Sequence, residues 1–227
     1  MLSIIVPCLN EAPRIAETLA SLAPLRARGA EVIVVDGGSY DDTVALAQAG
    51  ANLVICAAPG RAAQMNAGAA RARGEILFFL HADSNPPPQA DGLIIDGLAR
   101  SRRNWGRFDV AIDGRHPLLR AVERLMNLRS RLTGIATGDQ GLFVRRTLFD
   151  AAGGFPPIAL MEDVALTRRL KRVGRPLCLR HRIVTSGRRW EKHGVARTIL
   201  LMWWLRLAFW LGANPDKLAL RYAANRN

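Results

Sequence analysis

The chain has 227 residues, of which 49% are hydrophobic and 22% are charged, a composition that excludes intrinsic disorder and allows one domain with a sizeable core. Lys and Arg outnumber Asp and Glu by 32 to 19, which gives a formal net charge of +13. Most of this excess is arginine, and it predicts an anionic partner: a nucleotide diphosphate, a nucleic acid or an anionic membrane surface. Charge alone does not choose among the three.

The three cysteines are Cys8, Cys56 and Cys178. Their odd number and the absence of metal-ligand spacing argue against a disulfide framework and favour a reducing cytoplasm. The first apolar run is short and has no basic region before it, so no signal peptide is predicted.

The first hundred residues alternate between short apolar runs and helical patterns. Strands are predicted at 2–7, 31–36, 51–56 and 75–80, and helices at 13–22, 41–49 and 61–73. Because the strand runs are almost continuously apolar, this alternation predicts an α/β fold with a mainly parallel, twisted sheet flanked by helices. In such sheets, ligands bind at the carboxyl ends of the strands.

The second half of the chain is less regular. It predicts helices at 91–102, 117–132 and 162–173, a strand at 105–112, and a short strand after a turn within 138–146. No linker or internal repeat divides the chain, so we expect a single domain over residues 1–227.

Polar groups and glycines follow each of the first four strands. They are Asn10 with Glu11, Asp36 with Gly37 and Gly38, Gly60 with Arg61, and His81 with Asp83. If the strands are parallel, all of these groups gather along one edge of the sheet. This gathering is a stronger functional signal than any single motif.

Asp36 and the helix after Gly60 each have two interpretations. A carboxylate followed by two glycines suits recognition of a base or ribose, and it is equally an ordinary capped turn. A helix that begins at Gly60-Arg61 offers free N–H groups and a fixed charge to a phosphate. Gln64 lies in its first turns. The alternative is a small-residue helix packed tightly on the sheet.

Asp83 follows a buried strand, where an unpaired carboxylate is costly. Mg²⁺ or Mn²⁺ could join it to a diphosphate, because these ions often take one or two carboxylates together with substrate phosphates. His81 could be a further ligand or could orient Asp83. Alternatively, Asp83 caps the turn into the prolines that follow.

Two acidic positions and one basic cluster mark the second half. Glu162 and Asp163 begin a helix, either as capping residues or to present a catalytic base. Asp139 and Gln140 lie in a turn before a strand, where they could contact an acceptor or cap. The basic residues of 188–193 could clamp a diphosphate leaving group or form a solvated loop.

The motifs SIIVPCLNEA, VIVVDGGSYDDT, GRAAQMNAG, LFFLHADS, MEDVALTRRLKR and GRRW follow one another over residues 2–190. In this order they resemble family 2 glycosyltransferases of the GT-A fold, and most of all a bacterial "transferase 2" subgroup often encoded near radical-SAM or selenium-linked genes. The sequence departs from the family pattern at His81, which replaces the first acid of Asp-x-Asp, and at the missing Gln before GRRW.

The resemblance implies a nucleotide-binding half (1–100), an acceptor and catalytic half (101–190) and C-terminal helices (191–227). It implies inverting transfer of a sugar from a nucleoside-diphosphate donor, a UDP-sugar, to an unidentified acceptor, assisted by Mg²⁺ or Mn²⁺. Asp36 would contact the base, Arg61 the pyrophosphate, and Asp83 the metal; Asp163 would be the general base. Other positions at the nucleotide are Pro7, Leu9, Asn10, Glu11, Gly37, Gly38, Gln64, His81 and Ala82. Arg188 and Arg189 would act on the leaving group, and Asp139, Gln140, Glu162 and Trp190 on the acceptor.

The run 199–212 is apolar nearly all round, with Arg206 in its middle, and it is short for a bilayer crossing. Three roles for this run stay open: a helix that covers the core, a dimer interface, and a helix on the membrane surface. We expect the protein in the cytoplasm, with or without contact to the inner face of the membrane. Rival functions are a nucleotidyltransferase, a transferase that binds nucleotide without catalysis, and a nucleic-acid-binding module. No nucleic acid partner is expected, because the basic residues are dispersed.

Overall fold

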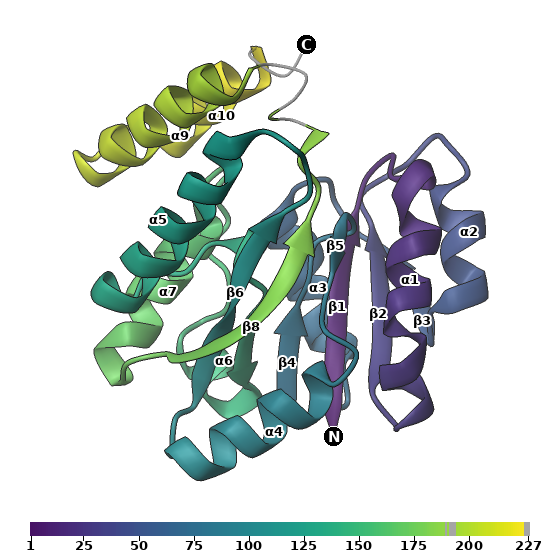
Figure 1. Ribbon diagram of the computed structural model, residues 1–227. Coiled ribbons are helices and arrows are strands. Elements are labelled where there is room, and N and C mark those ends of the chain that lie inside the picture. The colour runs from purple at the N-terminus through teal and green to yellow at the C-terminus, as the bar shows by residue number, and fades with distance from the viewer. Residues whose placement is uncertain (189, 191–193, 225–227) are drawn as a thin grey trace.

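The structure is a computed structural model that describes residues 1–188, 190 and 194–224. The described residues form one eight-stranded sheet in the order β3-β2-β1-β4-β7-β6-β8-β5, with helices against both faces (Figure 1). The strands are β1 Leu2–Cys8, β2 Glu31–Asp36, β3 Leu53–Cys56, β4 Ile76–Phe79, β5 Ser84–Asn85, β6 Trp105–Ile112, β7 Leu142–Arg145 and β8 Leu177–Thr185.

The helices follow the strands in the alternation that the sequence predicts. They are α1 Ala12–Ala27, α2 Thr43–Gly50, α3 Arg61–Arg71, α4 Ala90–Ser101, α5 Pro117–Thr133, α6 Arg146–Ala151, α7 Glu162–Val173, α9 Val195–Trp210 and α10 Pro215–Ala224. A 3₁₀ turn over Gly138–Gln140 precedes β7.

The sheet is mainly parallel, as expected. β1 pairs in parallel with β2 and β4, and β2 with β3, so the carboxyl ends of these four strands lie along one edge. β7 runs antiparallel between β4 and β6, and β8 is again parallel to β6. The polar groups that follow β1 and β4 are thereby brought to the same side of the molecule.

The core has one layer on each face of the sheet, because successive side chains of a strand point to opposite faces. Ile4 and Phe78 pack with α1 and α4, whereas Ile5 and Phe79 pack with α3 and α7. α3 lies close to the sheet: a Cβ atom added at Gly68 would come within 2.5 Å of Ile5 Cγ2. Close packing of α3 is therefore one reason for its small residues.

Several elements differ from the sequence expectation. β8 was not predicted, because a register shift opposite Phe108 and Asp109 leaves three consecutive exposed polar residues, Arg180 to Arg182, within the strand. β5 and α6 were not predicted either, whereas α9 and α10 lie within the predicted C-terminal helices. α1 continues to Ala27, past the exposed Pro24 and with Leu25 buried, whereas the sequence predicted that the helix ends at Leu22.

The C-terminal helices α9 and α10 pack on each other and lie beside α5, beyond the carboxyl ends of the strands (Figure 1). Leu205 of α9 and Leu218 of α10 are buried with Met161 and Val164. Part of the apolar run therefore covers the core. Within the described residues, no helix has the length and apolar character that a bilayer crossing requires.

Candidate active site

Two adjoining cavities open at the carboxyl edge of the sheet. The main cavity has a volume of about 460 Å³, and its polar lining includes Glu11, Arg61, His81, Asp83, Asp139 and Arg188. A smaller cavity of about 70 Å³ shares Arg61, His81 and Asp139 with it, and adds Glu162, Asp163, Arg206 and Tyr222. The structure thus brings together residues that follow β1, β3 and β4 and those that begin α7.

Arg61 is the first residue of α3 and the basic centre of this group. Burial alone would lower the pKa of its guanidinium, but the carboxylates of Glu162, Asp139, Asp163 and Asp83 raise that pKa above its ordinary value. The side chain is nevertheless accessible to solvent, because it faces an open cavity. Arg61 is therefore a permanent positive charge at the junction of the two cavities.

Asp163 is held by backbone N–H groups. Its Oδ2 accepts a hydrogen bond of 2.7 Å from Gly138 N–H, and its Oδ1 accepts one of 2.6 Å from Val164 N–H. One bond comes from the 3₁₀ turn and the other from α7 itself, so the carboxylate has a fixed orientation at the wall of the smaller cavity. Its remaining lone pairs are left for a proton.

Glu162 is only 4% exposed. Burial, followed by the neighbouring charge of Asp163, raises the pKa of the Glu162 carboxyl to about 7. At neutral pH this residue is therefore partly protonated.

His81 faces the 3₁₀ turn. Its Nδ1 lies 3.3 Å from Asp139 Oδ1, and a Cβ atom added at Gly138 would come within 2.3 Å of its Nε2. Both ring nitrogens therefore point toward the turn, and His81 lies between Asp139 and Gly138. A side chain at position 138 would displace the His81 ring, so glycine makes room for this close approach.

Asp83 is half-buried in the main cavity, and the described residues contain no cluster of three or more His, Cys, Asp or Glu side chains that could hold a metal ion. A single carboxylate beside an open cavity fits Mg²⁺ or Mn²⁺ only if substrate phosphates supply further oxygens. Ser186 N–H donates to the Asp83 carbonyl oxygen over 3.1 Å, which joins this loop to the end of β8.

Asp36 does not line either cavity. It is 2% exposed, and its carboxylate accepts hydrogen bonds from Gly38 N–H, Ser39 N–H and the Ser39 hydroxyl. Burial opposes ionisation, but these hydrogen bonds lower the pKa of Asp36 below its ordinary value. The structure thus favours the capped-turn interpretation of this residue. Gly38 has φ +96°, a conformation that favours glycine.

Gln64 is reassigned from nucleotide binding to a structural position. Its side chain is 3% exposed, and its amide donates to the carbonyl oxygens of Cys8 and Val35 at the ends of β1 and β2. A Cβ atom added at Gly37 would lie 3.0 Å from Gln64 Nε2, so glycine makes room for this amide.

Pro7, Ala82 and Gln140 are also buried away from the cavity lining. Pro7 lies within β1, and Ala82 packs in the core, so neither side chain is available to a ligand. Gln140 is fully buried, which corrects the expectation that it meets the acceptor.

Two predicted nucleotide contacts lie in the loop after β1. Leu9 is exposed and Asn10 is half-exposed. Asn10 adopts φ +54°, which asparagine tolerates better than most residues. Its N–H donates to the Ser39 hydroxyl and its side-chain oxygen accepts from Tyr40 N–H, so the loops after β1 and β2 are joined.

Arg188 and Trp190 line the main cavity, and Arg188 Nη2 lies 3.8 Å from Glu11 Oε2. Arg189 and the rest of the basic cluster, 191–193, lie outside the described residues.

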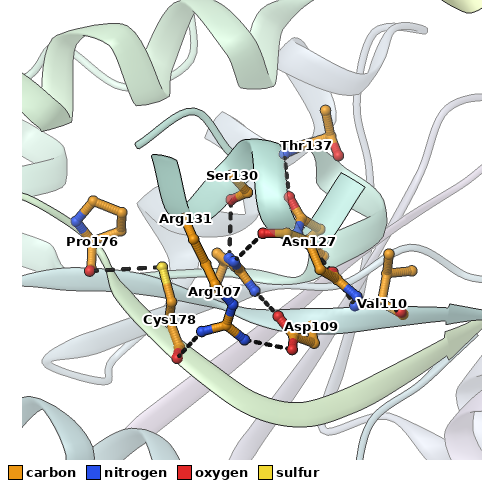
Figure 2. A network of polar contacts seen from close by, with 10 residues as sticks. Arg107, Asp109, Val110, Asn127, Ser130, Arg131, Thr137, Pro176 and Cys178 are labelled. Atoms are coloured by element: carbon orange, nitrogen blue, oxygen red, sulfur yellow. Dashed lines mark hydrogen bonds and ion pairs between the residues drawn. The ribbon is translucent and has the colours of Figure 1, made fainter. Parts of the chain in front are cut away.

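A buried polar network supports the 3₁₀ turn from below (Figure 2). Arg107 has no exposed surface; it pairs with Asp109 and donates to the Ser130 hydroxyl and the Asn127 carbonyl oxygen. Arg131 Nη2 pairs with the other Asp109 oxygen at 2.5 Å. The Asn127 side chain accepts from Gln140, whose own oxygen accepts from Thr137 N–H. β6 and α5 thereby fix the turn that donates to Asp163.

Residues 3–151 match the sequence profile of glycosyl transferase family 2. This chain belongs to that family. The undecaprenyl-phosphate 4-deoxy-4-formamido-L-arabinose transferase of Pseudomonas fluorescens strain SBW25 is 33% identical over 171 residues, which cover 66% of this chain and 48% of the relative. The chain thus spans about half the length of the curated relatives it matches.

Similar solved structures confirm the GT-A fold. S. aureus TarS 1–349, in complex with UDP-GlcNAc, has a TM-score of 0.68 at 21% identity and covers 82% of this chain and 58% of its own. The mannosyltransferase PcManGT from Pyrobaculum calidifontis, in complex with GDP-Man and Mn²⁺, has a TM-score of 0.63 at 25% identity, with coverages of 81% and 56%.

Sequence reasoning assigned no role to two basic residues in or near this candidate site. Arg206 lines the smaller cavity, and Arg129 of α5 lies close enough to Arg206 and Asp163 for their charges to affect its pKa. Arg129 is one of several arginines in an amphipathic helix, and no local pattern distinguishes it from those that face solvent. For Arg206, the sequence contains one indication of a special role, which is its position as a charged residue within an apolar run.

Proposed function

We propose that the chain transfers a sugar from a UDP-sugar to an acceptor, with inversion at the anomeric carbon. The observation that carries the proposal is the junction of two cavities at Arg61, with Asp83 in one cavity and Asp163 in the other. The main cavity is large enough for a nucleotide ligand. Family membership and the UDP-GlcNAc complex of TarS support a nucleotide-sugar donor. The "transferase 2" subgroup stays a prediction.

In the proposed reaction, an acceptor oxygen attacks the anomeric carbon from the face opposite the diphosphate. The new carbon–oxygen bond forms as the bond to the β-phosphate oxygen breaks, and UDP leaves with the electron pair. Asp163 takes the acceptor proton, because its carboxylate is oriented by Gly138 N–H and lies at the smaller cavity. Arg61 and Arg188 offset the negative charge that develops on the departing diphosphate.

Asp83 would hold a divalent ion together with the diphosphate of the donor. Bound there, Mg²⁺ or Mn²⁺ would supply charge stabilisation for the leaving group. Mn²⁺ in the PcManGT complex supports a divalent ion in this fold. His81 is not assigned as a ligand, because its ring nitrogens face Asp139 and Gly138.

The donor and the ion are tested together by thermal unfolding with a panel of nucleoside diphosphates and their sugars, with Mn²⁺ or EDTA. A ligand at about 100 times its Kd should stabilise the wild-type fold by about 2.7 kcal/mol. We expect UDP-sugars to give the largest shift with Mn²⁺, and Asp83→Ala to lose the Mn²⁺-dependent part. Equal shifts in Mn²⁺ and EDTA would rule out the ion, and no shift with any nucleotide would rule out the donor.

We infer that the outer face of α5, α9 and α10 contacts an anionic membrane surface. Its exposed apolar side chains are Leu125, Leu128, Leu132, Leu200, Trp203, Leu207 and Trp210. The exposed charged residues of the three helices are five basic ones and one acidic one, which matches anionic headgroups; they are Arg120, Arg124, Arg197, Lys217, Arg221 and Asp216. The undecaprenyl-phosphate substrate named for the P. fluorescens relative supports a location at a membrane. A dimer through the same face is the competing arrangement.

Flotation with vesicles separates the two arrangements. The wild-type chain should co-float with anionic phospholipid vesicles and not with neutral ones, and the double variant Trp203→Glu with Trp210→Glu should lose most of this binding. Tyr40→Glu is the matched control, because Tyr40 is exposed far from these helices along the chain. If the wild-type chain does not bind vesicles and elutes as a dimer, the face contacts a second copy of the chain and not a membrane.

A further inference from the structure

A second basic region lies away from the candidate active site. Two adjoining cavities, of about 290 Å³ and about 310 Å³, share Leu148 of α6 and Val173 of α7 in their walls. Val173 is the last residue of α7 and Glu162, at the active site, is the first, so this 12-residue helix separates the two regions by about 18 Å. The pair of cavities, here the distal groove, lies at the opposite end of the sheet from α9 and α10 (Figure 1).

The distal groove combines an apolar floor with a strongly basic rim. Leu148 is half-buried, and Val173 is 65% exposed although it is apolar. Among the described residues that line the groove, none is acidic and five are arginines: Arg102, Arg103, Arg169, Arg172 and Arg175. Like charges at this density repel one another and destabilise the folded chain.

The folded chain does not neutralise these five arginines. Within the part of the chain that the structure describes, none of them forms an ion pair. Arg103 donates to the Arg175 carbonyl oxygen, Arg175 to that of Arg131, and Arg169 to that of Ala152. A carbonyl oxygen orients a guanidinium but does not cancel its charge. The groove is therefore held in shape with its positive charge intact.

The ends of two helices do not account for so many cations. α4 ends at Arg102 and α7 ends at Gly174, and each helix C-terminus carries about half a negative charge. About one positive charge would offset both ends, and Lys171 and Arg172 already lie in the last turn of α7. The arginines of the groove thus exceed what the helix ends need, and an anionic partner explains the excess.

We propose that the distal groove binds an acidic segment of a partner protein, with apolar side chains over Leu148 and Val173 and carboxylates against the arginines. The basic rim selects negative charge, and the apolar floor selects a segment that also carries apolar side chains. Arginine suits the rim because its guanidinium donates two parallel hydrogen bonds to a carboxylate. The inference does not rest on the proposed function, since the groove shares no described lining residue with the active-site cavities.

Two other anionic partners fit the groove less well. A bilayer surface is bound by protruding apolar side chains, and these lie at the other end of the molecule, on α9 and α10, whereas Leu148 lies in a hollow. Single-stranded nucleic acid binds through exposed aromatic rings. Trp105, the one aromatic residue among the described lining residues, is 1% exposed and donates to the Gly174 carbonyl oxygen over 2.8 Å.

The experiment selects peptides of random sequence by phage display against the full chain. We expect the enriched peptides to combine a net negative charge with apolar residues. One enriched peptide is labelled with fluorescein, and its binding is measured by anisotropy at about 0.1 M and about 1 M salt. Binding should weaken at the higher salt concentration, where the Debye length falls from about 10 Å to about 3 Å. Anionic phospholipid vesicles and a single-stranded thymidine oligonucleotide are tested as competitors.

The test variant is Arg102→Glu with Arg172→Glu, two exposed arginines whose side chains form no hydrogen bond within the described part of the chain. Arg180→Glu with Arg182→Glu is the matched control, because it changes the net charge equally at exposed positions of β8. The test variant should weaken peptide binding about 10-fold or more, and the control less than about 3-fold. Val173→Ser should weaken it about 3- to 10-fold, because an apolar contact is lost while every charge stays.

All variants should keep the thermal unfolding midpoint of the wild type, which shows that they fold. Enriched peptides without acidic residues, or no enrichment at all, would overturn the proposal. So would an acidic peptide that binds the test variant and the control with equal affinity. Vesicles or the oligonucleotide displacing the peptide from the wild type, and themselves failing to bind the test variant, would assign the groove to a lipid surface or to nucleic acid instead.

Discussion

Asp163→Asn is expected to lower the rate of sugar transfer by about 10²- to 10⁴-fold, because an amide cannot accept the proton of the attacking oxygen. Asparagine has nearly the same shape and retains one oxygen acceptor. Only one of the two backbone N–H groups, from Gly138 and Val164, then loses its partner. UDP binding should therefore be retained.

The measurement is release of UDP from a UDP-sugar with water as the acceptor, since this slow hydrolysis needs the same base and no knowledge of the natural acceptor. Glu162→Gln is the matched control on the adjacent residue. Glu162 is already partly protonated at neutral pH, because burial and Asp163 raise its pKa to about 7. Glu162→Gln should therefore lower the rate of UDP release much less than Asp163→Asn does. Turnover of Asp163→Asn at the wild-type rate would remove Asp163 from the mechanism.

Asp109→Ala should lower the free energy of unfolding by about 3–5 kcal/mol, the usual effect of leaving a buried charge without its partner. Asp109 is the carboxylate shared by Arg107 and Arg131, and Arg107 has no exposed surface. The substitution leaves one guanidinium buried and uncompensated. It also loosens the contact between β6 and α5 that supports the turn at Gly138.

Urea unfolding at neutral pH measures this loss. Asp96→Ala is the control, because Asp96 and Arg100 form an exposed ion pair on α4 that should contribute less than about 1 kcal/mol. If both variants lost the same small amount of stability, the network in Figure 2 would have no special role.

The first half of the fold could be predicted because its signals are local. Continuous apolar runs separated by turns indicate parallel strands, and parallel strands place Glu11, Arg61 and Asp83 on one edge without any further information. β8 could not be predicted in this way. Its register shift interrupts the apolar alternation, and only the pairing with β6 shows that it is a strand.

Sequence reasoning identified residue types at the site better than their tasks. Gln64 and Gln140 follow the same rule as Arg61, that polar residues near strand ends contact a ligand, yet both side chains are buried against backbone or neighbouring side chains. Asp36 also follows this rule, yet its carboxylate accepts hydrogen bonds from Gly38 and Ser39 of its own turn. For Gln64 the deciding partners, Cys8 and Val35, lie 56 and 29 residues away along the chain, so no local pattern could show that its side chain faces away from the cavity.

A crystal structure of the chain with UDP and Mn²⁺ tests the central claim most directly. The diphosphate should lie in the main cavity, within hydrogen-bonding distance of Arg61 or Arg188 and joined to Asp83 through the ion. UDP bound away from these residues, with the cavity at the carboxyl ends of β1 and β4 filled only by water, would contradict it.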